Sequence, residues 1–77
     1  MDRTDAIRLL EALVAAGMNT HTARTNVWIK KQATEIELLG SQFASAIAYA
    51  GNEGWLTDAP WRGCTFLTDA GEAIARS

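Results

Sequence analysis

The residue types that most often do chemistry in small proteins are scarce in this 77-residue chain, which has one histidine, His21, and one cysteine, Cys64. His21 stands in a polar stretch and Cys64 in an apolar one, with no third group spaced to orient either. A catalytic nucleophile needs an adjacent base, and that base needs a group that orients it. We therefore interpret His21 as a solvated loop residue and Cys64 as a small buried hydrophobic residue.

Metal and acid–base sites are also hard to build from this composition. A four-ligand zinc site would need carboxylates for most of its ligands, which is uncommon. Glu35 and Glu37 lie two positions apart and so do not share a helix face. The six glycines are scattered, and no glycine-rich loop could cradle a phosphate. The sequence predicts a protein that is not an enzyme and that has no metal site and no cofactor.

The charges of the chain are distributed unevenly. Residues 12–34 contain no acid and three cations, Arg24, Lys30 and Lys31, whereas all nine acids lie in the rest of the chain. A protein with a formal net charge of -2 can therefore still present one basic strip to a partner.

Length and composition favour one domain over residues 1–77, because two domains would each be too small to hold a core. An apolar content of 48% with three tryptophans excludes a disordered tail. The longest apolar run, Ala12 to Met18, is far shorter than the roughly 20 residues of a membrane-spanning helix. The first residues lack the layout of a signal peptide. We expect a soluble cytoplasmic protein of marginal stability, with no membrane partner.

The first third of the chain predicts a helix, a loop and a short strand. The helix is expected from residue 4 or 5 to residue 16, with Thr4 as its cap and Gly17 ending it. Residues 18–26 are polar and rich in turn formers, so they predict a loop. Val27–Ile29 are β-branched or aromatic, which favours a short strand.

Two further helices are expected in the middle of the chain. Apolar residues at helical spacing predict one from Lys30 to Leu39 and another from Gln42 to Glu53. Gly40 interrupts the pattern between them, and Ser41 is the expected cap of the later helix. Gly54 ends that helix.

After residue 54 the apolar period changes from helical to alternating. Trp55–Thr57 and Cys64–Leu67 are expected to pair as a hairpin around a turn-rich loop that contains Pro60 and Gly63. Asp69 and the residues that follow it form a D-x-x-E capping pattern that opens a last short helix. The expected core consists of Ile7, Leu10, Val14, Ile36, Leu39, Phe43, Ile47, Leu56 and Phe66.

This order of elements resembles the winged helix-turn-helix superfamily over roughly residues 27–76. The stretch Glu53-Gly54-Trp55-Leu56-Thr57 is similar to the exit of a recognition helix into the first wing strand. The stretch from Phe66 to Ile74 is similar to the Leu-Thr-x-x-Gly close of the wing. The resemblance implies an α+β, mostly α fold: a three-helix core, a two-stranded β-hairpin wing and a short C-terminal helix.

The resemblance also implies binding of double-stranded DNA and a role in transcription regulation. In winged helices the start of the second helix meets phosphates, the third helix enters the major groove and the wing tip reaches the backbone. Glutamine and asparagine can pair with adenine, so an uncharged reading helix is chemically possible. The candidate DNA-binding residues are those at these three places, together with Arg24 as a further cation: Arg24, Lys30, Lys31, Gln42, Ser45, Tyr49, Asn52 and Arg62.

The same surface allows a second interpretation, a non-enzymatic module for protein interaction or dimerisation. The third helix carries no Lys or Arg, and small residues lie between its polar ones. Interface cores are depleted in charge and enriched in aromatic residues. Tyr49 on this helix and Trp61 at the hairpin tip are the candidate anchors, unless Trp61 folds back onto Trp55. The partner is then a protein or a second copy of the chain.

Overall fold

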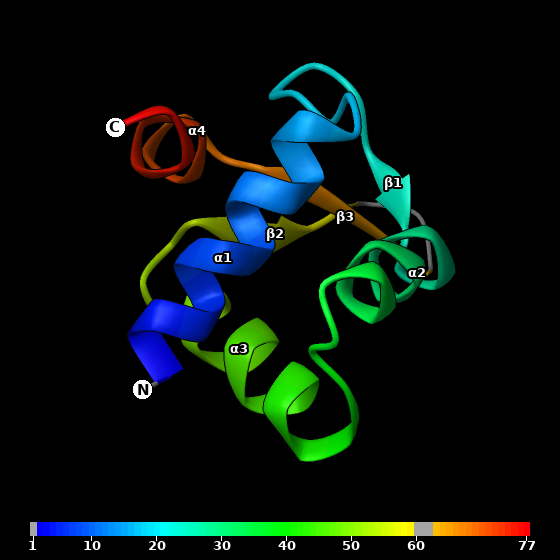
Figure 1. The fold of residues 1–77 in the computed structure, drawn as a ribbon. Helices are drawn as coiled ribbons and strands as arrows, with labels where there is room; N and C mark the ends of the chain where they lie inside the picture. Colours follow the sequence, from blue (N-terminus) through cyan, green and yellow to red (C-terminus); the bar gives the residue numbers. More distant parts are fainter. Residues whose placement is uncertain (1, 60–62) are drawn as a thin grey trace.

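The structure is a computed structural model that describes residues 2–59 and 63–77. Within these residues the fold is α+β and mostly helical, with four helices and a three-stranded antiparallel sheet (Figure 1). In chain order the elements are α1 (Asp2–Ala15), β1 (Arg24–Thr25), α2 (Asn26–Glu35), α3 (Gly40–Asn52), β2 (Leu56–Asp58), β3 (Cys64–Leu67) and α4 (Asp69–Arg76).

The sheet has the strand order β1-β3-β2, so the hairpin of β2 and β3 is extended by the strand that precedes α2. Leu56 lies opposite Leu67, and Asp58 lies opposite Thr65. Because opposed residues share a face of the sheet, these four side chains point to one side. The expected pairing of residues 55–57 with residues 64–67 is confirmed, with the first strand beginning one residue later.

Helix α1 is the centre of the molecule and lies across the sheet between α3 and α4 (Figure 1). It begins at Asp2, so Thr4 lies inside the helix and is not its cap. Its buried stripe is Ala6, Leu9, Leu10 and Leu13. Helices on several sides of α1 cover this wide stripe, and Ile7 and Val14, expected in the core, lie half-buried at its edges.

The expectation of a strand at Val27–Ile29 is wrong, because these residues form the first turn of α2. The Thr25 hydroxyl oxygen accepts a hydrogen bond from the Trp28 backbone N–H at 3.1 Å, which is a helix N-cap. The strand lies just before it, at β1. Capping and burial of Ile29 on the helix therefore override the β propensity of three residues.

Helix α2 ends at Glu35 and not at Leu39. Glu37 adopts a left-handed conformation with φ of 61°, and the backbone N–H of Leu38 bonds back to the Ala33 carbonyl at 2.9 Å. This reversal buries Leu38 and leaves Leu39 53% exposed, so Leu39 is not a core residue.

The cap expected at Ser41 is also wrong. Helix α3 begins at Gly40, and Leu39 occupies the N-cap position without a side-chain hydrogen bond. The backbone N–H groups of the first turn of α3 are therefore not capped by a side chain.

Helix α4 is held against the start of the hairpin. The Thr68 hydroxyl accepts a hydrogen bond from the Gly71 backbone N–H at 3.0 Å and donates to the Gly54 carbonyl oxygen. Gly71 is buried so close to the Trp55 backbone that a Cβ there would overlap its carbonyl oxygen. The expected last helix is confirmed, but its N-cap is Thr68, and Asp69 lies in its first turn.

Two expected core residues, Leu10 and Leu56, are buried, whereas Ile36, Phe43, Ile47 and Phe66 are half-buried. The spacing patterns identified the apolar faces but not their deepest members. The buried hydrophobic residues are Ala6, Leu9, Leu10, Leu13, Met18, Ile29, Ala33, Leu38, Ala46, Ala50, Trp55, Leu56 and Leu67.

Candidate macromolecule-binding surface and groove

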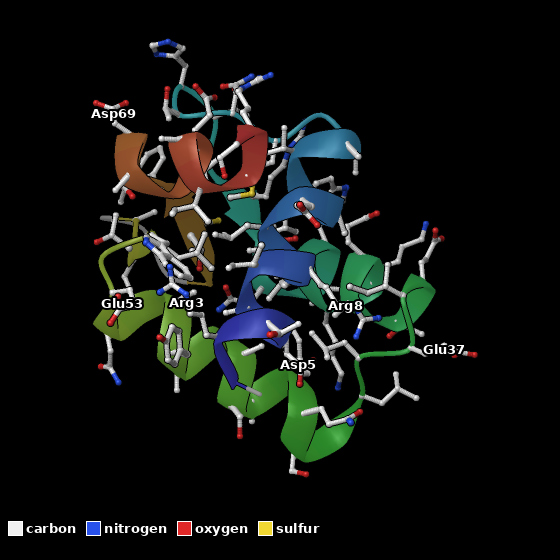
Figure 2. All side chains as sticks on the ribbon, turned by 60° about the vertical axis from the view of Figure 1, so that its left-hand side comes forward. Arg3, Asp5, Arg8, Glu37, Glu53 and Asp69 are labelled. Atoms are coloured by element: carbon white, nitrogen blue, oxygen red, sulfur yellow. The ribbon has the colours of Figure 1, made fainter. Side chains whose placement is uncertain are left out.

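The outer face of α3 is polar and uncharged. Gln42, Ser45 and Asn52 are exposed, as the helical spacing predicted. Buried Ala46 and Ala50 fix the opposite face of the helix against the core. The charged side chains that are labelled in Figure 2 lie on α1, on α4 and in the turns that flank α3, and none of them lies on α3 itself. The helix can therefore approach either a nucleic acid or a neutral protein surface without unfavourable charge.

Tyr49 does not belong to this exposed face. It is half-buried, and its ring centroid lies 5.7 Å from that of Trp55 with the rings tilted by 52°. Trp55 is only 5% exposed, and the Arg3 guanidinium lies 5.3 Å from its ring centroid. The candidate anchor Tyr49 is therefore only partly exposed, because the turn after α3 brings Trp55 back against the helix.

The candidate phosphate-binding cations differ in their surroundings. Lys30 and Lys31 are exposed on α2 and make no ion pair within the described residues. Arg24 is half-buried, with its guanidinium 4.9 Å from the centroid of the Trp28 ring and its Nε buried without a hydrogen-bond partner. Stacking on Trp28 therefore holds Arg24 beside α2.

A second arginine, Arg8, donates a hydrogen bond to the turn between α2 and α3. Arg8 of α1 donates from Nη2 to the Ile36 carbonyl oxygen at 3.1 Å and lies 3.5 Å from the Asp5 carboxylate. Figure 2 shows its side chain directed toward the turn that carries Glu37. The bond satisfies a carbonyl at the end of α2 and thereby fixes the position of the helix pair on α1.

A groove that the sequence did not reveal lies between α2, α3 and the hairpin, with a volume of about 340 Å³. Ile29, Phe43 and Ile47 form its apolar walls, and Asp58 and Thr65 lie at its polar end. The sequence signal that could have indicated it is a glycine inside a helix, Gly51, because this position adds no side chain to the wall.

The hairpin tip lies outside the described residues. The expectations for Trp61 and Arg62 therefore stay predictions, including the packing of Trp61 on Trp55. His21 is exposed in the loop before β1, and its backbone N–H donates to Asn19 Oδ1 at 2.8 Å. Cys64 is half-buried in β3. Over residues 2–59 and 63–77 no group of three His, Cys, Asp or Glu residues could hold a metal ion.

No protein-family model, no curated protein and no solved structure matches the chain in these three comparisons. Within the part of the chain that the structure describes, no helix has the length and apolar character needed to cross a membrane.

Proposed function

We propose that the chain is a winged helix-turn-helix module that binds double-stranded DNA, with α3 as the reading helix. The order α1, β1, α2, α3, β2, β3 supports this proposal, as does the pairing of β1 with β3. In such modules two helices joined by a tight turn place the later helix in the major groove. Here the turn between α2 and α3 is short and is braced by Arg8.

The observation that carries the proposal is the acid-free outer face of α3, where Gln42, Ser45 and Asn52 are exposed. Amide side chains can donate to and accept from an adenine edge at the same time. A carboxylate on this face would repel the phosphates on both sides of the groove. The face is therefore compatible with base reading, although it contributes no charge to affinity.

Affinity would come from the surroundings of α3. Lys30 and Lys31 are exposed cations on α2, and neither α2 nor α3 has an acid in its first turn. Helix N-termini carry a partial positive charge that favours phosphate. With so few cations, binding by one copy is expected to be weak and strongly dependent on salt.

The test is fluorescence anisotropy with labelled duplexes over a range of salt concentrations. Lys30→Ala with Lys31→Ala should weaken binding to all sequences about equally and reduce the salt slope by roughly two. Lys30→Arg with Lys31→Arg is the matched control and should keep the slope. Gln42→Ala or Asn52→Ala should instead relax sequence preference. No binding to any duplex at low salt would overturn the proposal.

The second candidate function is a protein interaction or dimerisation module. The observation that favours it is apolar exposure near the helix pair: Val27 is 81% exposed and Leu39 is 53% exposed. Small residues on α3, Ala44 and Ala48, would let another backbone come close. Tyr49, one of the two suggested anchors, offers only part of its surface to a partner because its ring is half-buried against Trp55.

A single substitution separates the two functions. Ala48→Lys adds a cation to the outer face of α3, so it should strengthen DNA binding and weaken any protein contact made by that face. Ala48→Gln is the matched control for side-chain length. Sedimentation equilibrium of the parent chain and the variant reports self-association, and anisotropy reports DNA binding.

A further inference from the structure

The groove between α2, α3 and the hairpin has an apolar part that is open to a ligand. Ile29 of α2, Phe43 and Ile47 of α3, and Leu56 of β2 form this part. Phe43 and Ile47 lie on successive turns of one helix face and are only half-buried. A Cβ at Gly51, one turn further along the same face, would meet no atom within 4 Å. Phe43 and Ile47 therefore offer apolar surface that the fold itself leaves partly uncovered, whereas Ile29 and Leu56 are buried.

The other end of the groove is rich in hydrogen-bond acceptors. Thr65 donates its hydroxyl hydrogen to Asn26 Oδ1 at 2.8 Å, so its oxygen lone pairs remain free to accept. Asp58, directly opposite Thr65 in the hairpin, is exposed. Its carboxylate makes no hydrogen bond or ion pair to the side chains of residues 2–59 and 63–77. The Asn26 amide nitrogen is left as a donor at this end.

The groove is also negatively charged. Asp58 is the one charged side chain among its described lining residues, and no Lys or Arg lines it there. A DNA phosphate would be repelled by this carboxylate, so the natural occupant differs in charge from the DNA proposed for the outer face of α3. An unpaired carboxylate beside an apolar wall is complementary to a molecule with a cationic head and an apolar body.

We propose that this groove is a binding site for a small organic cation, an amine with an apolar body. The ammonium group donates to the Asp58 carboxylate and the Thr65 hydroxyl oxygen, and the body packs on Phe43 and Ile47. The volume of about 340 Å³ lies within the range of pockets that hold small molecules. This site is separate from DNA binding, and its test does not depend on that function.

The test is an NMR titration of the isotopically labelled full chain with phenethylamine, 2-phenylethanol and 3-phenylpropionate. These probes share a ring and differ in head-group charge. The amine should bind saturably and shift the backbone amides of Ile47, Asp58 and Thr65. The alcohol should bind about tenfold more weakly, and the carboxylate should not bind. Equal binding of the amine and the alcohol would overturn the proposal.

Two matched pairs of variants locate the site. Asp58→Asn should weaken amine binding about tenfold, whereas Glu11→Gln, which removes an exposed acid on α1, should leave it unchanged. Gly51→Leu should block the groove, whereas Gly51→Ala should leave room for the ligand. Unliganded spectra confirm that each variant folds. Binding at the parent level by both Asp58→Asn and Gly51→Leu would contradict the site.

A titration with a short peptide distinguishes a small-molecule site from a protein docking site. A short peptide that carries Phe next to Lys has the same apolar and cationic groups on a backbone. Binding of this peptide much tighter than that of phenethylamine, with the same dependence on Asp58, would overturn the small-molecule assignment and identify the groove as a protein docking site.

Discussion

The two sides of the hairpin are packed very differently. On the side of α1 and α4, Trp55 is buried, and Gly71 of α4 touches its backbone. On the side of α2 and α3, Phe43 and Ile47 are half-buried, and a Cβ at Gly51 would meet nothing. A domain of this size has little stability to spare. Buried residues lie on both sides, but only the side of α2 and α3 keeps half-buried apolar side chains beside a groove, and that side is left free to bind.

Truncation in the close-packed centre should have the largest effect. Leu13 of α1 is fully buried, so Leu13→Ala should lower the free energy of unfolding by about 3 to 5 kcal/mol. Leu39→Ala removes the same atoms from an exposed position and should cost less than about 1 kcal/mol. Urea denaturation followed by tryptophan fluorescence measures both. Similar losses would show that Leu39 is covered in solution.

The junction of α4 with Trp55 is the next most sensitive place. Gly71→Ala puts a methyl group against the Trp55 carbonyl oxygen, so α4 must move away. We expect a loss of about 1 to 3 kcal/mol in the free energy of unfolding, with a changed near-UV signal from Trp55. If this variant is as stable as the parent, the close approach does not exist and the two sides are packed alike.

The cap of α4 should contribute less. Thr68→Ala removes a hydroxyl that bonds to both Gly71 and Gly54. The expected loss is about 1 kcal/mol, as for other helix N-caps. Thr68→Ser keeps the hydroxyl and should recover most of this stability. Thermal unfolding by circular dichroism compares the three proteins, and a Ser variant no better than the Ala variant would point to the lost methyl group.

The smallest effect is expected on the open side, and its sign is opposite. Gly51 lies inside α3 with ordinary helical φ and free space around it. Gly51→Ala should therefore raise the free energy of unfolding by about 0.5 to 1 kcal/mol through helix propensity. Urea denaturation, as for the Leu13 and Leu39 variants, measures this gain in the free energy of unfolding. Destabilisation would mean that the groove is closed in solution.

The outer face of α3, proposed to bind DNA, and the groove differ in how far the sequence revealed them. Exposure of Gln42, Ser45 and Asn52 follows from helical spacing, because residues opposite a buried stripe must face solvent. The half-burial of Tyr49 does not follow, since it depends on a ring contact with Trp55 across a turn. Gly51 inside a helix is a local signal of the groove, but the sequence does not show that walls from α2, α3 and the hairpin come together around it.

The sequence by itself determined the type and order of most elements. Periodicity, the left-handed glycines at positions 17 and 54, and the alternating strands around the hairpin loop are local properties that a short window records. These properties predicted α1, α3, the hairpin and α4 to within a few residues of their observed bounds.

Only the tertiary structure decided that the chain changes from strand to helix between Thr25 and Asn26. It also decided that Leu38, and not Leu39, enters the core after α2. Pairing of Arg24 with Thr65 and the Thr25 cap make Val27–Ile29 helical, although their own propensity favours a strand. The left-handed Glu37 buries Leu38 in place of Leu39. The strand pairing joins segments far apart in the sequence, and the reversal at Glu37 bonds Leu38 back to Ala33 outside the helical repeat, so the apolar spacing of the helices carries no record of either.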